Sequence, residues 1–97
     1  MRYSYEFARA ANEEYKDAVQ WYSEKSLSAA ENFIESVEHA IILICEHPER
    51  WRNLYKHFYE LNVKKYPYNI IYSIEEELIS IQSIYHHSRN PKKKYKK

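Results

Sequence analysis

The spacing of hydrophobic residues changes twice along this chain, and that change constrains the fold more than any single motif. Residues 2–7 alternate large aromatic with polar side chains, which is typical of a strand with one buried face. From about Ala8 the hydrophobic residues recur at helical spacing, and from about residue 58 a spacing of two returns. We therefore expect a strand, then two helices, then three strands.

Both expected helices carry a stripe of hydrophobic side chains. The stripe of the first comprises Ala11, Tyr15, Ala18, Val19 and Tyr22, and that of the second Ala30, Phe33, Val37, Ile41 and Ile44. Residues 25–28 separate the helices. Ser28 with Glu31 has the pattern of a capping box that starts the second helix, and Pro48 is expected to end it after His47. Helices joined by so short a break form a hairpin, which is expected to cover a sheet.

Three strand-like segments follow a connector of residues 48–56. In the first, Tyr59, Leu61 and Val63 share one face, whereas Phe58, Glu60, Asn62 and Lys64 share the other. Residues 68–74 are apolar on both faces, as a central strand is, and residues 78–85 form the third segment. Because the chain has no glycine, its tight turns are expected at Pro67 and at residues 75–77.

These elements predict an α+β fold in the order β-α-α-β-β-β. The helical hairpin is expected to pack on one face of a mostly antiparallel four-stranded sheet, leaving the other face available for function. The 97 residues form one domain, assigned to 1–91, followed by a basic tail, 92–97, that is expected to be mobile.

The small net charge of +1 conceals an asymmetry between the two halves. Residues 1–49 contain four basic and ten acidic side chains, whereas residues 50–97 contain eleven basic and four acidic ones. Opposed halves of this kind indicate that one end faces a polyanion or an acidic partner. Alternatively, the charges belong to a solvated helical face and a charged tail.

Several classes of function are disfavoured by the composition. Without glycine, the phosphate-cradling loops of ATPases and dinucleotide-binding enzymes are excluded, and no cofactor is expected. The lone Cys45 lies in a six-residue apolar run, so we expect a buried thiol in a reducing, cytoplasmic protein that does not cross a membrane. No metal site is expected, because the adjacent His86 and His87 point to opposite sides of a strand.

The order of elements and four local motifs together resemble the RelE/ParE superfamily, the toxins of type II toxin–antitoxin systems. The motifs are Trp21–Tyr22 late in the first helix, Pro48 after the second, Lys65–Tyr66–Pro67–Tyr68 opening the central strand, and His86–His87–Ser88–Arg89–Asn90–Pro91 closing the last. The resemblance covers nearly the whole chain. It implies a plasmid-stabilisation-type toxin that a cognate antitoxin neutralises by wrapping its C-terminal segment around it.

Two modes of action are known for such toxins. The first expectation is ribosome-dependent cleavage of mRNA, and the alternatives are ParE-like inhibition of DNA gyrase by protein–protein binding, or a non-toxic relative that only binds the antitoxin. The resemblance assigns the catalytic positions to His86 and Arg89. RNA or partner contacts are assigned to Lys64, Lys65, Tyr66, Tyr85, His87 and Tyr95.

These residue types suit metal-independent RNA cleavage. An imidazole can act as acid or base, a guanidinium can hold the phosphate, ammonium groups add charge, and tyrosine rings can stack on bases. One departure weakens this expectation: Tyr59 stands where relatives commonly have an arginine, and Lys56 or His57 would have to compensate for it. Alternatively, His86 is a strand-end side chain with a structural hydrogen bond.

Overall fold

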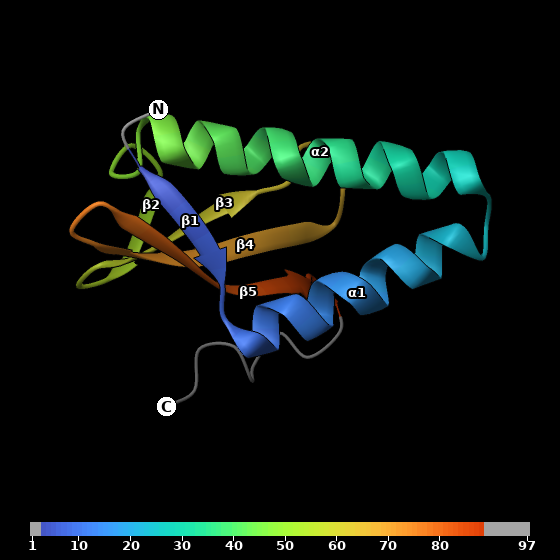
Figure 1. Ribbon diagram of the computed structural model, residues 1–97, viewed down its shortest axis with the longest axis horizontal. Coiled ribbons are helices and arrows are strands. Elements are labelled where there is room, and N and C mark those ends of the chain that lie inside the picture. Colours follow the sequence, from blue (N-terminus) through green and yellow to red (C-terminus); the bar gives the residue numbers. More distant parts are fainter. Residues whose placement is uncertain (1–2, 89–97) are drawn as a thin grey trace.

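The computed structural model of the chain describes residues 3–88 and consists of two helices on one face of a sheet (Figure 1). The elements are β1 (Ser4–Phe7), α1 (Arg9–Ser23), α2 (Leu27–Glu46), β2 (Arg52–Tyr55), β3 (Phe58–Asn62), β4 (Tyr68–Glu75) and β5 (Leu78–His86). The sheet has five strands in the order β1-β5-β4-β3-β2. Only the β1–β5 pair is parallel; the other pairs are antiparallel. The α+β class and the helical hairpin are therefore confirmed.

The expected number of strands is wrong by one. Strand β2 lies within residues 48–56, which the sequence indicated only as a connector, and it pairs with β3 across a register shift between Asn53 and Tyr55. The four residues of β2, Arg-Asn-Leu-Tyr, do not alternate polar with apolar side chains, so they show no period of two. The Asn53 amide holds the following turn, since its Nδ2 donates to the carbonyls of Lys56 (2.9 Å) and Phe58 (3.1 Å).

The helical hairpin buries the expected stripe of α2, including Phe33 and Val37, which are completely buried. The capping residue differs from the expected Ser28. Helix α2 begins at Leu27, and the Oγ atom of Ser26 accepts a hydrogen bond from the backbone N–H of Ala29 (3.0 Å). Ser28 is already helical, so its side chain cannot cap the N-terminus. The helix ends at Glu46, one residue before the expected end, and His47 is its C-cap residue.

The core between the helices and the sheet is rich in aromatic rings. Tyr22 stacks on Phe33 with 4.7 Å between ring centroids, and Phe33 also contacts Tyr66 and Tyr68. Tyr72, fully buried in β4, donates its hydroxyl to the Pro48 carbonyl at 2.5 Å. Burial raises the pKa of Tyr72 above its ordinary value. These contacts attach the central strand to both ends of α2.

Cys45 is buried as expected, with 1% of its surface exposed. Burial raises the pKa of the Cys45 thiol, so the protonated form is favoured near neutral pH. Within residues 3–88, neither helix is long and apolar enough to cross a membrane.

The three hairpin turns form without glycine, as expected. Lys56 in the β2–β3 turn, Lys65 in the β3–β4 turn and Glu76 in the β4–β5 turn all have positive φ angles (50°, 72° and 58°). Non-glycine residues adopt this left-handed conformation at a modest energetic cost. The β3–β4 and β4–β5 turns contain the residues predicted for them, around Pro67 and at residues 75–77.

Candidate functional site

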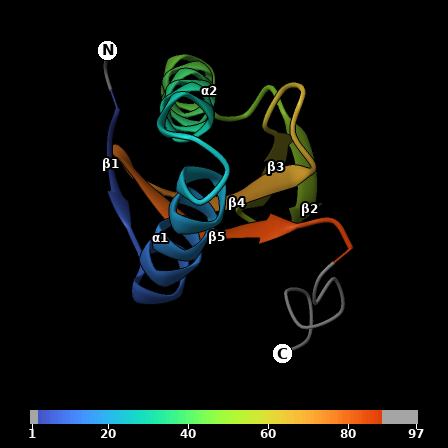
Figure 2. The same ribbon diagram turned by 90° about the vertical axis from the view of Figure 1, so that its right-hand side faces the viewer.

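One end of the sheet brings together the six described residues that were predicted for the site, namely Lys64, Lys65, Tyr66, Tyr85, His86 and His87. The backbone N–H of His87 donates to the Pro67 carbonyl (2.8 Å), and His86 pairs with Tyr68 across β4 and β5. The end of β5 therefore lies beside the β3–β4 turn, in which Lys64 and Lys65 are exposed. Figure 2 views the molecule from this end, with the α1–α2 turn nearby. Arg89 and Tyr95 lie outside the described residues.

His86 and His87 point to opposite faces of the sheet, in agreement with the alternation of side chains along a strand. The ring of His86 lies edge-on to Tyr68 at 5.1 Å, on the helical side. Its Nδ1 accepts a hydrogen bond from the backbone N–H of Ser88 (3.1 Å), so in this arrangement the ring proton is on Nε2. His86 thus makes the local structural hydrogen bond that the alternative interpretation predicted.

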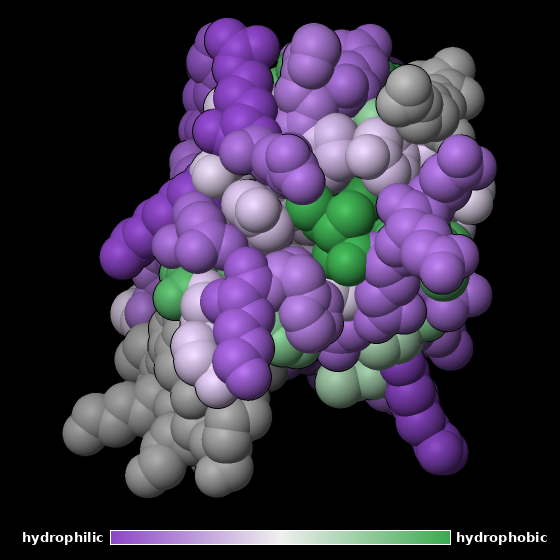
Figure 3. All heavy atoms as spheres, turned by 90° about the vertical axis from the view of Figure 1, so that its left-hand side faces the viewer, coloured by the Kyte–Doolittle hydropathy of each residue, from purple (hydrophilic) through white to green (hydrophobic). Residues whose placement is uncertain are grey.

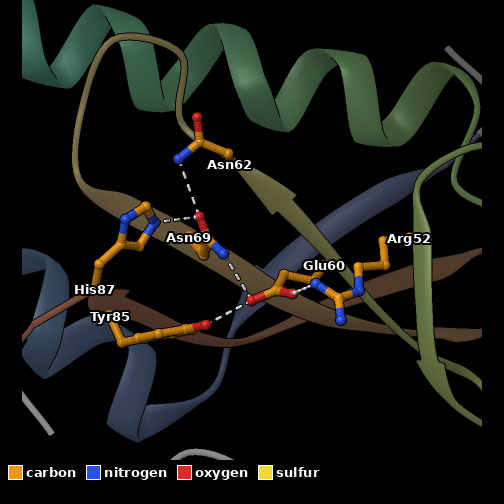
Figure 4. Close-up of polar contacts among 6 residues, drawn as sticks. All are labelled: Arg52, Glu60, Asn62, Asn69, Tyr85 and His87. Atoms are coloured by element: carbon orange, nitrogen blue, oxygen red, sulfur yellow. Dashed lines mark hydrogen bonds and ion pairs between the residues drawn. The ribbon is translucent and has the colours of Figure 1, made fainter. Parts of the chain in front are cut away.

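His87 joins a group of polar side chains on the face of the sheet away from the helices. We call this group the polar network; it comprises Arg52, Glu60, Asn62, Asn69, Tyr85 and His87 (Figure 4). Asn69 is at its centre. Its Oδ1 accepts from Asn62 Nδ2 (3.0 Å) and lies 2.8 Å from His87 Nε2. Because this oxygen is an acceptor, His87 must donate from Nε2.

Glu60 is the buried charge of the polar network, with 5% of its surface exposed. Its Oε2 accepts hydrogen bonds from Tyr85 (2.6 Å) and Asn69 (2.7 Å), and its Oε1 lies 3.6 Å from an Nη of Arg52. These partners compensate the desolvation of the carboxylate. The sequence placed Glu60 on the correct face but did not indicate burial, because Tyr85 and Asn69 meet it only through strand pairing.

Tyr66 and Tyr85, which were assigned to RNA or partner contacts, and Tyr59, which stands in place of an arginine, all contribute to packing. Tyr85 is only 7% exposed and its hydroxyl is bonded to Glu60, so in this arrangement its ring is not open to stack on a base. Tyr59 is half-buried and stacks on Tyr72 at 5.7 Å. Tyr66 packs edge-on against Tyr22 at 5.6 Å. Large amphipathic rings of this kind fill the rim of a small core while their hydroxyls reach water or a partner.

The residues proposed to compensate for the missing arginine lie elsewhere. His57 is next to Ile74 at the opposite end of β4, since the Ile74 N–H donates to its carbonyl (3.2 Å). That position is roughly 17 Å along the strand from Asn69, at about 3.3 Å per residue. Lys56 and His57 therefore lie far from His86, which pairs with Tyr68 at the other end of β4. Figure 3 shows this opposite end, which is mostly hydrophilic around a small hydrophobic area.

Among residues 3–88, no three histidine, cysteine, aspartate or glutamate side chains are grouped as a metal site would require. What the end of the sheet offers is two imidazoles on opposite faces, two exposed ammonium groups and a buried, fully bonded carboxylate. This arrangement is suited to contacting an anionic or acidic surface.

The comparisons with known proteins identify the family. The family model described as "ParE toxin of type II toxin-antitoxin system, parDE" matches residues 5–91. The chain belongs to the ParE toxin family. The resemblance to the RelE/ParE superfamily is thereby confirmed. Members of the ParE toxin family are described as toxins of a type II toxin–antitoxin system. Such a system implies an antitoxin partner.

A solved structure described as the chromosomal ParDE TA system from P. aeruginosa has the same fold as this ParE family member. The two superpose with a TM-score of 0.67 at 17% sequence identity, covering 88% of this chain and 96% of the other. No curated protein sequence matches the chain.

Proposed function

We propose that this ParE family member is the toxin of a type II pair and stops growth by binding DNA gyrase, without cutting RNA. The observation that carries the proposal is the separation of His86 from the polar network by the plane of the sheet. General acid–base cleavage of RNA requires an acid and a base on one side of a phosphate. Here His86 packs against Tyr68 on the helical side, whereas Glu60 and His87 lie on the other.

The packing of Tyr59 supports the same proposal. At the position where relatives commonly have an arginine, its ring lies parallel to Tyr72 and belongs to the core. Tyr59 itself carries no charge with which to stabilise a developing phosphate charge. A toxin that acts by binding needs neither the arginine nor a convergent catalytic pair.

The test is induced expression with separate measurements of DNA synthesis, mRNA integrity and gyrase supercoiling by the purified chain. We expect DNA synthesis to stop while mRNA stays intact, and supercoiling to be inhibited. His86→Ala is expected to keep its toxicity, as is the matched control His39→Ala on the exposed side of α2.

Cleavage of mRNA that His86→Ala abolishes and His39→Ala preserves would overturn this proposal and establish the ribonuclease. That second candidate function has one observation in its favour: His87 and the Lys64–Lys65 pair lie at the same end of the sheet as the buried Glu60. If neither activity is found but a cognate antitoxin binds, the chain is a non-toxic relative.

A further inference from the structure

The turn between α1 and α2 exposes two large hydrophobic side chains. Trp21 is 43% exposed and Leu27 is 72% exposed. The other exposed hydrophobic side chains among residues 3–88, Tyr5, Ile42 and Tyr55, belong to three separate elements, and scattered single residues of this kind are common on protein surfaces. Trp21 and Leu27 differ because they flank one short turn, Trp21 in the last turn of α1 and Leu27 as the first residue of α2.

Trp21 stands on a rigid support of packed rings. It lies edge-on to Tyr22 at 5.0 Å, and Tyr22 in turn contacts Phe33, Tyr66 and Tyr68. Phe33 is fully buried. An exposed aromatic side chain that the core already holds in place loses little conformational entropy on binding, which is a property of interface anchors.

The same ring cluster connects this turn to the lysines of the β3–β4 turn. Tyr66, flanked by Lys65, contacts both Tyr22 and Phe33. On the helical side, Lys25 holds its Nζ 4.5 Å from the centre of the Trp21 ring. We call this surface the aromatic end; it comprises Trp21, Lys25, Leu27, Lys64, Lys65 and Tyr66. Both turns lie at the end of the molecule seen in Figure 2.

The charges around the aromatic end identify the kind of surface that fits it. Lys25, Lys64 and Lys65 are all exposed, against a single acidic residue, Glu24, in these two turns. The helical layer beyond them is acidic. A partner therefore matches this surface when it presents acidic side chains around an apolar pocket that admits an indole or a leucine.

We infer that the aromatic end is the surface by which this toxin binds its target, DNA gyrase. The matching site on the target is expected to be acidic and to contain an apolar pocket. The inference rests on the proposed function, because it names the part of the chain that contacts the target protein. Trp21 is the central anchor, Leu27 extends the apolar contact, and the lysines accelerate and orient the encounter.

The chain offers a matched control for each variant, at the opposite end of the sheet. Trp21→Ala is compared with Tyr55→Ala, since Tyr55 is an exposed aromatic residue (61%) whose ring also lies beside a lysine, Lys56. Lys65→Glu is compared with Lys56→Glu, because both lysines are exposed hairpin residues with positive φ. Circular dichroism and thermal unfolding establish that each variant folds.

The experiment measures the affinity of purified gyrase for the wild-type chain and the four variants. We expect Trp21→Ala to weaken binding by roughly 30-fold, as loss of an interface anchor does. Lys65→Glu should weaken it by about tenfold at low salt, with a smaller effect at high salt. Tyr55→Ala and Lys56→Glu should stay within about threefold of the wild type.

Equal affinities for Trp21→Ala, Lys65→Glu and their controls, in a wild-type chain that does bind gyrase, would overturn this inference and leave the proposed function intact. A wild-type chain that neither binds nor inhibits gyrase would overturn the proposed function and this inference with it. If the two variants lose affinity for the antitoxin but not for gyrase, the surface belongs to the antitoxin, and the inference is wrong.

Discussion

Buried polar atoms at single residues join parts of this protein that are distant in the sequence. The Tyr72 hydroxyl reaches across 24 positions to the Pro48 carbonyl, at the point where the chain leaves α2. The Trp51 indole donates to the Leu43 carbonyl within the same connection, at 3.4 Å. The Pro48 carbonyl lies beyond the last residue of α2 and has no donor within the helix, whereas the Leu43 carbonyl also accepts from the backbone N–H of His47 (3.2 Å). Tyr72 therefore links β4 to the end of α2 through a hydrogen bond inside the hydrophobic core.

Replacement of Tyr72 by phenylalanine tests this role. The ring is kept, but the buried Pro48 carbonyl loses its donor, so the free energy of unfolding is expected to fall by about 1–3 kcal/mol. Urea denaturation followed by circular dichroism measures the loss. Tyr55→Phe is the control, because its exposed hydroxyl should contribute less than about 0.5 kcal/mol.

The same variant has a signature at alkaline pH. Burial raises the pKa of Tyr72, whereas in the unfolded chain tyrosine ionises near pH 10. Above about pH 10 the unfolded state releases this proton and the folded state retains it, so stability falls as pH rises. Tyr72→Phe should show a shallower fall than the wild type; an identical slope would contradict the assignment.

Strand β1 is shorter than its neighbour β5, and a side chain of α1 forms hydrogen bonds with the part of β5 that β1 does not reach. Strand β1 pairs with β5 only from Leu78 to Ile81, yet β5 continues to His86. Beyond β1, the Glu14 carboxylate replaces the missing strand: its Oε1 accepts from the Ser83 hydroxyl (2.8 Å) and from the Ile84 N–H (2.9 Å). A backbone N–H near the edge of the sheet is thus satisfied by a helix side chain.

Truncation of Glu14 should loosen the end of β5 that carries His86 and His87. Glu14→Ala removes a charged acceptor and is expected to lower the free energy of unfolding by about 1.5–3 kcal/mol. Glu14→Gln keeps an oxygen in place and should lose less. Amide hydrogen exchange provides the local readout, with faster exchange at Ile84. The exposed neighbour Glu13→Ala is the control, and an equal loss there would contradict the role assigned to Glu14.

The whole molecule is two layers that share one core. The hairpin contributes Phe33, Val37 and Ile44, and the sheet contributes Ile70, Tyr72 and Ile81, all of them fully buried. The layers differ in charge, because α1 and α2 contain seven acidic and two basic side chains. Six of the eleven basic residues in the C-terminal half lie beyond residue 88, outside the described residues. These six include the five lysines of the expected basic tail, residues 92–97.

A shared core predicts that both layers unfold together. The two tryptophans report on different regions, Trp21 near the helical turn and Trp51 before β2. In the single-tryptophan variants Trp21→Phe and Trp51→Phe, denaturation followed by fluorescence should coincide with denaturation followed by circular dichroism. A fluorescence midpoint distinct from the circular-dichroism midpoint in either variant would show that the layers unfold separately.

The periodicity of the sequence was sufficient to predict the helical hairpin, its buried stripe, four of the five strands of the sheet and the turns without glycine. Those features depend on residues within a few positions of one another, because hydrophobic spacing and turn chemistry are local properties. The order of elements, together with the four local motifs, was also sufficient for the family. Strand β2 was not predicted, because its four residues do not alternate between polar and apolar side chains.

Tertiary structure alone decided the environment of the candidate site. Glu60 meets Tyr85 across 25 positions and Glu14 meets Ile84 across 70, so strand register and helix packing determine which side chains become buried and bonded. The same strand pairing places His86 and His87 beside the β3–β4 turn, whereas Lys56 lies at the opposite end of the sheet. Hydrophobic spacing reports which face a side chain occupies, but only the assembled sheet determines what that side chain contacts.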